Sequence, residues 1–281
     1  MKSLFVWSLN IVSGAISYLS ITHLPFIASA AIEVIKTIAL CEWMDHATKH
    51  KKQRHKHTTT TVDNRLMIHT QYTVPNACIK HLIHISLIET TLDYTWTSLI
   101  FIIPRMFAFE VVFDFVHYFI HKACHDSVWL YQRVHKTHHT HVSKSKHGAL
   151  STIQTMVMSP WEIVLVYGVP TAVAMIAVPM SAMEFCLQAS FLSYQEFGGH
   201  IGREMRPTSS FAQFIWLPRW LGIELYSEDH EMHHTHLNCN YGKRFSLADK
   251  MFGTFTKTPL ISSDAPANEG PSPSQRLVTD T

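Results

Sequence analysis

The stretch His117-Tyr-Phe-Ile-His121-Lys-Ala-Cys-His125 places a histidine at every fourth position. An α-helix has about 3.6 residues per turn, so side chains four residues apart lie on nearly the same face and form one stripe. A single buried histidine is usually structural and is satisfied by a hydrogen bond. Three in register would each need a separate polar partner away from water, so the stripe favours metal binding.

Two further clusters share the pattern His-x-x-His-His, namely His135-Lys-Thr-His138-His139 and His230-Glu-Met-His233-His234. On a helix, positions i and i+3 can bind one ion while position i+4 turns toward another, and neutral imidazole is the commonest protein metal ligand. Three such helices could therefore surround more than one metal ion. The third cluster also contains HExxH, the zinc protease motif with Glu231 as the base, but a protease site leaves the other two clusters unexplained.

One more histidine, His200, lies between glycines in the stretch Glu196-Phe-Gly-Gly-His200-Ile-Gly202. Flanking glycines permit close backbone approach, so His200 is a candidate ligand beside the three clusters. The carboxylates of Asp114, Glu196 and Asp229 could offset metal charge or orient imidazoles. His141 and His236 are not predicted to be ligands but could support the ligands from outside. His147 is not predicted to be a ligand. The predicted metal ligands are His117, His121, His125, His135, His138, His139, His200, His230, His233 and His234.

Apolar segments predict a membrane protein with several spans. Leu4 to Leu24 contains no Asp, Glu, Lys or Arg and is long enough to cross a bilayer, which takes about 20 residues. A signal peptide with Lys2 at its start and a cleavage site at Ala28-Ser-Ala30 is the alternative, although the apolar run is long for one. Pro170 predicts a kink in one of the later spans. These later spans are Pro25–Cys41, Ile79–Ile103, Met156–Val178 and Pro179–Phe197, the last two forming a helical hairpin.

Charge and cysteine usage limit the possible functions. The net charge of +2 offers no broad basic surface, so nucleic acid is not an expected partner. The five cysteines are odd in number and form no CxxC pair, which argues against a disulfide framework and a zinc ribbon. The basic stretch Lys49–His57, and the lysines and arginines around the clusters, place all three histidine clusters on the cytoplasmic side.

We therefore expect an all-α fold, a polytopic membrane helical bundle with a cytoplasmic, histidine-rich di-metal cap. Residues 1–104 are expected to form an N-terminal membrane region with a basic loop, and residues 105–258 the catalytic domain. Residues 259–281 are expected to be a disordered tail, because the end of the chain is rich in Ser, Pro and Asp and poor in large apolar residues.

The three boxes HxxxH, HxxHH and HxxHH, set between apolar segments, resemble the histidine motif of the membrane fatty acid hydroxylase/sterol desaturase superfamily. The resemblance runs from about Phe107 to Phe255. Trp129–Lys136 is similar to the linker into the family's second box, and Asn240–Gly242 and Asp249–Thr254 are similar to its closing segment. Residues 233–240 look most like the cholesterol 25-hydroxylases. His117-Tyr-Phe119 and Gly199–Gly202 look like the sterol C4-methyl oxidases.

This resemblance implies a non-haem di-iron oxygenase of the endoplasmic reticulum membrane whose histidine boxes face the cytosol. It implies O2-dependent hydroxylation or desaturation of a lipid, with a sterol as first choice and a fatty acyl chain or alkylglycerol as alternatives. It also implies two Fe ions, dioxygen as co-substrate, and cytochrome b5 or an NAD(P)H reductase as external electron donor. Ligand type alone does not select iron over zinc or copper. A zinc-dependent membrane hydrolase and a non-enzymatic metal-binding membrane protein therefore remain alternatives.

Overall fold

The computed structural model describes residues 3–51, 62–89, 91–93, 95, 100–139, 152–203 and 211–257. Within these ranges the fold is helical. The β-type pairings found there are single bridges, between Leu92 and Ser181 and between Glu224 and Phe245. The predicted all-α class is confirmed. The basic stretch from residue 52 onward, His141, His147 and the predicted tail 259–281 lie outside the described residues.

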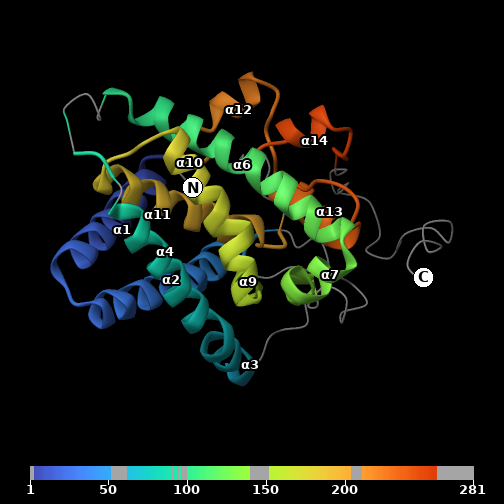
Figure 1. The fold of residues 1–281 in the computed structure, drawn as a ribbon. Helices are drawn as coiled ribbons and strands as arrows, with labels where there is room; N and C mark the ends of the chain where they lie inside the picture. The colour runs from blue at the N-terminus through green and yellow to red at the C-terminus, as the bar shows by residue number, and fades with distance from the viewer. Residues whose placement is uncertain are drawn as a thin grey trace.

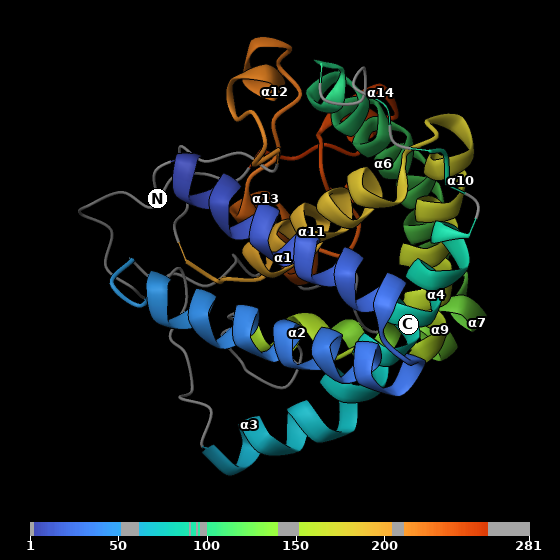
Figure 2. The ribbon, with the colours of Figure 1, turned by 90° about the vertical axis from the view of Figure 1, so that its left-hand side faces the viewer.

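The first two helices form an antiparallel hairpin on one side of the molecule (Figure 2). They are α1 (Ser3–His23) and α2 (Phe26–Thr48), and they meet at Pro25. Proline has no N–H and disfavours helical backbone in the residue before it, so α1 ends there. The charged pair of α2 is satisfied inside the hairpin, because Glu33 binds Lys36 (3.0 Å) and accepts a hydrogen bond from Ser17 (2.6 Å).

Helix α11 (Ala182–Gly199) lies at the centre of the bundle, with α1 packed along it and α2 beside it. A capping box starts α11: the hydroxyl of Ser181 accepts from the Glu184 N–H, and the Glu184 carboxylate accepts from the Ser181 N–H. Helix α1 approaches closely at Gly14, where an added Cβ would lie 2.9 Å from the Leu187 Cα. Figure 2 shows α1 in front of α11.

Helix α6 (Ile102–Asp126) crosses the molecule diagonally and packs along α10 (Val169–Ala177) (Figure 1). Together α9 (Pro160–Glu162), the π-helical turn η4 (Ile163–Gly168) and α10 make one continuous helix, Pro160–Ala177. The Ser159 hydroxyl caps its start by accepting from the Glu162 N–H. Aromatic side chains of α6 and α11 form the core between them, namely Phe109, Phe113, Phe185 and Phe191.

By length and composition, two described helices could cross a membrane, α1 and Pro160–Ala177. They correspond to the predicted spans Leu4–Leu24 and Met156–Val178. The predicted span Ile79–Ile103 is wrong as a single helix, because α4 (Val74–Ile88) stops and α6 starts only at Ile102. Between them, Leu92 donates its N–H to the Met180 carbonyl (3.1 Å), an interaction that a continuous helix would forbid.

The two predicted spans Met156–Val178 and Pro179–Phe197 do not form the predicted helical hairpin. A 3₁₀ turn, η3 (Thr152–Met156), precedes the first helix. After the bend before Ser181 the chain turns away, so α10 packs along α6 while α11 packs along α1. The predicted spans Pro25–Cys41 and Pro179–Phe197 fall largely within α2 and α11, and neither helix is among the two that meet the criterion for crossing a membrane.

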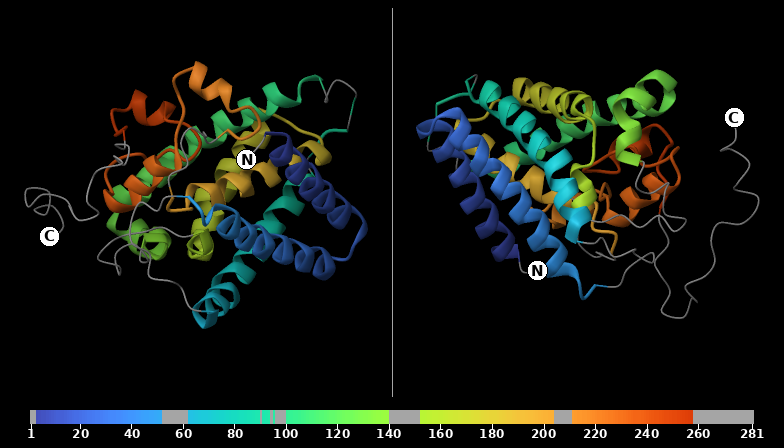
Figure 3. Two further views of the ribbon diagram at one scale, coloured as in Figure 1. Left: turned by 180° about the vertical axis from the view of Figure 1, so that it is seen from behind. Right: turned by 90° about the horizontal axis from the view of Figure 1, so that it is seen from below.

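The histidine-rich segments gather at the C-terminal end of α6, on the side away from the α1–α2 hairpin (Figure 3). There α7 (Val128–Leu130), the π-helical turn η2 (Tyr131–His135) and α13 (Ser227–Thr235) approach α6 and the end of α11. The remaining described elements are α3 (Val62–Ile68), η1 (His69–Thr73), α12 (Trp216–Trp220) and α14 (Leu247–Met251).

The close approach of α1 to α11 gives a stability prediction. Gly14→Leu places a side chain against the Leu187 backbone, and we expect the midpoint of thermal unfolding in detergent to fall by about 5 °C. Ala15→Leu, on the exposed face of the same helix, is the matched control and should leave the midpoint unchanged. Equal midpoints for the two variants would contradict the packing of α1 on α11.

Candidate metal centre

Nine of the ten predicted ligands come together in two groups whose ring nitrogens lie within 4.8 Å of one another in each group. The first group is His121, His125, His135, His139 and His233; the second group is His138, His200, His230 and His234. Helix α6 supplies two of these side chains, the helical segment from η2 to residue 139 supplies three, and α13 supplies three. The last, His200, is the C-cap residue of α11.

The way each His-x-x-His-His cluster divides between the groups differs from the prediction. His135 shares a group with His139, four residues on, while His138 belongs to the other group. In the same way His230 shares a group with His234, and His233 joins the first group. The prediction that i and i+3 bind one ion is wrong, because residues four apart are offset by about 40° around a helix and residues three apart by about 60°.

Backbone carbonyls determine which nitrogen of several imidazoles carries the proton. The Nδ1 atoms of His121, His233 and His200 lie 2.7, 2.8 and 2.9 Å from the carbonyl oxygens of Tyr241, Cys239 and Glu196. A carbonyl can only accept, so each Nδ1 donates a proton and each neutral ring keeps a bare lone pair on Nε2. These lone pairs are therefore available to bind metal.

The arrangement of the Nε2 atoms fits bound cations. His135 Nδ1 is hydrogen-bonded to Glu162 Oε1 (2.8 Å), and with the carboxylate as acceptor its Nε2 is also bare. That atom lies 3.0 Å from His121 Nε2 and 2.8 Å from His139 Nε2. Among the described residues, the Nε2 atoms of His125 and His233 are buried without a hydrogen-bond partner. Facing lone pairs repel each other and unpaired buried nitrogens are costly, so a positive ion between them resolves both problems.

The second group has the same character. His200 Nε2 lies 3.2 Å from both His138 Nε2 and His230 Nε2, and His230 Nε2 lies 3.2 Å from His234 Nε2. Burial, and after it the neighbouring histidines, hold the pKa of His233 and His234 well below the usual range. The imidazoles of both groups are therefore neutral at pH 7, the state that metal ligation requires.

The tenth predicted ligand, His117, lies outside both groups. Its Nδ1 donates to the carbonyl oxygen of Val166 (2.9 Å), and its ring stacks on Phe113. This hydrogen bond attaches α6 to the helix Pro160–Ala177 through His117.

Other predicted residues act at a distance from the imidazoles. Asp114 accepts from the backbone N–H groups of Lys243, Arg244 and Phe245 (2.7, 2.7 and 3.1 Å) and so fixes the loop after α13. Asp229 accepts from the Tyr226 N–H (3.1 Å) at the start of α13. His236 is exposed and lies outside both groups.

Two charged residues at the site escaped the sequence analysis. Glu162, which orients His135, stands in an apolar segment, where a membrane span was the simpler interpretation. Lys243 follows the third cluster and is almost fully buried, with its Nζ 3.0 Å from both Glu196 Oε1 and His230 Nε2. Burial lowers the pKa of Lys243, and the Glu196 carboxylate opposes that effect. The Asn240-Tyr-Gly242 motif next to it was the available signal for Lys243.

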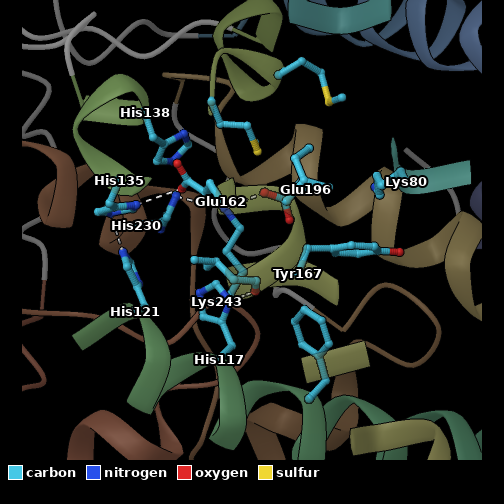
Figure 4. Close-up of a pocket in the computed structure, with 15 residues that line it drawn as sticks. Lys80, His117, His121, His135, His138, Glu162, Tyr167, Glu196, His230 and Lys243 are labelled. Atoms are coloured by element: carbon cyan, nitrogen blue, oxygen red, sulfur yellow. Dashed lines mark hydrogen bonds and ion pairs between the residues drawn. The ribbon is translucent and has the colours of Figure 1, made fainter. Parts of the chain in front are cut away.

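A cavity reaches both groups (Figure 4). The space between its lining atoms is about 560 Å³, part of it open to solvent. The apolar part of its wall consists of Phe113, Met156, Met158, Ile163 and Val166. His121 and His135 of the first group and His138 and His230 of the second line it as well. An apolar molecule in this cavity would lie directly against the metal-binding nitrogens.

Comparison with known proteins agrees with this arrangement. The family model described as fatty acid hydroxylase matches residues 106–254. A cholesterol 25-hydroxylase of Mus musculus is 27% identical over 161 residues, which is 54% of this chain and 47% of the relative. A fatty acid hydroxylase, vlmA, of a Lecanicillium species is 29% identical over 153 residues, covering 52% of this chain and 40% of the relative.

A plant relative gives a similar match. Methylsterol monooxygenase 1-3 of Arabidopsis thaliana is 25% identical over 162 residues, which is 56% of this chain and 50% of the relative. The aligned part thus spans half or less of the length of each of these three relatives. No solved structure matches the chain.

The division into two groups predicts separable metal loss. We expect His233→Ala and His234→Ala, although adjacent in sequence, each to make one of two bound ions extractable by a chelator, and the double variant to release both. Elemental mass spectrometry on detergent-purified protein measures this. His236→Ala, outside both groups, is the control and should keep both ions. Loss of the same ion from both single variants would contradict the assignment.

The Glu162–His135 hydrogen bond predicts a graded effect on metal affinity. Glu162→Ala removes the acceptor for His135 Nδ1, and we expect the affinity of the first group to fall by about 10–100-fold. Glu162→Gln retains an acceptor oxygen and should lose less. Competition with a chelator of known affinity gives both values, and an Ala variant that binds as tightly as wild type would show that Glu162 does not orient the ligand.

Proposed function

The chain belongs to the fatty acid hydroxylase family, and from this premise we propose that it is a membrane oxygenase that uses two iron ions to oxidise a lipid. The observation that carries the proposal is the pair of histidine groups whose ring nitrogens converge beside a largely apolar cavity. Nitrogen-rich sites suit iron, although they also accept zinc and copper, so the choice of iron rests on the family.

The proposed ligands are the nine histidines of the two groups, with His117 as a support between helices rather than a ligand. When bound, the metals supply the activation of dioxygen that a C–H bond of this kind requires. In hydroxylation the C–H bond is broken and one oxygen atom enters the product. The other oxygen leaves as water, which consumes two electrons and two protons. We assign the electrons to a separate donor, cytochrome b5 or an NAD(P)H reductase.

The chain's own residues position the substrate and hold protons. The apolar wall of Phe113, Ile163 and Val166 excludes water and accepts a hydrocarbon portion of a lipid. Lys243 keeps its protons beside the second group, and Glu196 holds this ammonium in place. Arg244 pairs with the other oxygen of Glu196 (3.3 Å), which fixes the carboxylate that holds Lys243.

We propose a sterol as the substrate, because several of the relatives are named for sterol oxidation. A fatty acyl chain is the second choice, since another relative is named a fatty acid hydroxylase. Hydroxylation and desaturation both begin with removal of hydrogen from carbon, and product analysis separates them. We further propose a multi-pass protein of the endoplasmic reticulum membrane with its histidine groups facing the cytosol. The two apolar helices support membrane insertion.

A zinc hydrolase is the second function to test. In its favour, His230 and His234 of the HExxH sequence share one group. Such an enzyme needs its glutamate at the substrate to act as base. Glu231 is not among the described residues that line the cavity, so the hydrolase has less support than the oxygenase.

Loss of a ligand from either group is expected to abolish turnover. We predict that His138→Ala and His233→Ala each lower oxidation of a supplied sterol by at least about 100-fold while the protein still inserts in membranes. The assay uses iron-loaded protein with oxygen and a reductase system, and His236→Ala serves as the control. Full activity in either variant, or turnover in the absence of oxygen, would contradict an oxygenase.

A further inference from the structure

The cavity beside the metal-binding groups contains a lysine that the proposed chemistry does not use. Lys80, on α4, lines the same cavity as His121 and His230. In the view of Figure 4 it lies on the opposite side from His121 and His135, with Tyr167 and Glu196 between them. The cavity therefore has an end at the metals and an end at a cation.

The ammonium of Lys80 has few partners among the described residues. Its Nζ donates to the Ser193 hydroxyl (3.2 Å) and lies 4.4 Å from the centre of the Tyr167 ring. No carboxylate oxygen of the described residues lies within 4.0 Å of it. An ammonium carries three N–H donors, so the hydrogen bond to Ser193 leaves two donors without an acceptor there.

The neighbouring polar groups are already engaged. The two oxygens of Glu196 pair with Lys243 and Arg244 (3.0 and 3.3 Å). The Tyr167 hydroxyl is in a hydrogen bond of 2.7 Å with His84, so this residue offers Lys80 its ring rather than its oxygen. A partly buried cation facing a cavity with unused donors is stabilised when a ligand brings an oxygen acceptor.

We propose that Lys80 forms a subsite for the polar oxygen of the lipid substrate, a hydroxyl or a carboxylate, and that the oxidised carbon belongs to the polar half of that lipid. The first part of this inference, the Lys80 subsite, is independent of the proposed oxygenase function. The second part, the position of the oxidised carbon, rests on that function. One cavity holds both the Lys80 ammonium and the metal-binding nitrogens, so a lipid held at its polar end presents nearby carbons to the metals. A carbon at the far apolar end of a long lipid would lie outside this reach.

Binding tests the first part without any turnover. Metal-loaded, detergent-purified full chain is titrated with two pairs of probes, stearic acid against octadecane and cholestan-3-ol against cholestane. Each pair differs only in the polar group, so the pair that discriminates identifies a carboxylate or a hydroxyl as the ligand. We expect wild type to bind the polar member of at least one pair about tenfold more tightly, the size of effect that one hydrogen bond to a charged donor supports.

Substitutions locate the effect. Lys80→Met and Lys80→Gln should abolish the discrimination, while Lys80→Arg, which keeps the charge, should retain it. Lys49→Met, at an exposed lysine, is the matched control. The metal content per chain identifies any Lys80 variant that fails to fold. Binding is compared with wild type only for variants that keep the wild-type metal content. No discrimination by wild type in either pair, or discrimination that survives the loss of Lys80, overturns the subsite.

Product analysis tests the second part. Fragmentation mass spectrometry of the product locates the new oxygen, and we expect it on the half of the lipid that carries the polar group. A new oxygen on the far apolar end overturns this part. Absence of any oxidised product with intact Lys80-dependent binding would reject the oxygenase function and leave the subsite standing, so the two failures are distinguishable.

Discussion

The hydrogen bonds from histidine Nδ1 atoms to backbone carbonyls are the interaction on which the candidate metal centre depends. Tyr241 and Cys239 supply two of these acceptors from the loop after α13, and Glu196 supplies a third from α11. The loop is itself tied down, because Asp249 accepts from the Tyr241 and Gly242 N–H groups (2.8 and 2.7 Å). Gly242 is needed there, since a Cβ would lie 2.6 Å from the Phe245 carbonyl. The fold thus directs the Nε2 lone pairs of His121, His233 and His200 before any metal binds.

Burial keeps the imidazoles of the two groups neutral. The ring nitrogens are removed from water, and their pKa values fall, so the groups stay neutral and open to a cation. The cavity beside these imidazoles has a partly apolar wall and is also lined by two cations, Lys80 and Lys243. Burial of the imidazoles thus supports both proposals, metal binding by the two groups and an apolar substrate with a polar end.

Periodicity predicted the helical class and eight of the nine histidines that converge, because spacing along a helix is local information. The ninth, His200, was predicted from its flanking glycines instead. Periodicity could not foresee that His117 binds the Val166 carbonyl, since that acceptor is a backbone atom of another helix, distant in sequence. The acceptors of the site are backbone atoms or, as with Glu162, a carboxylate distant in sequence, and no pattern marks them. From hydropathy, one span was predicted over residues that belong to two helices, α4 and α6. Apolar composition alone does not reveal that the chain between them bridges to Ser181 at Leu92.

The most direct test of the account is X-ray absorption spectroscopy at the iron edge of the purified, iron-loaded protein, together with the iron content per chain. The account predicts about two irons per chain, a first coordination shell rich in imidazole nitrogen, and scattering from a second iron nearby. A single metal ion per chain, or a shell dominated by sulfur or by oxygen alone, would contradict the assignment of the two histidine groups.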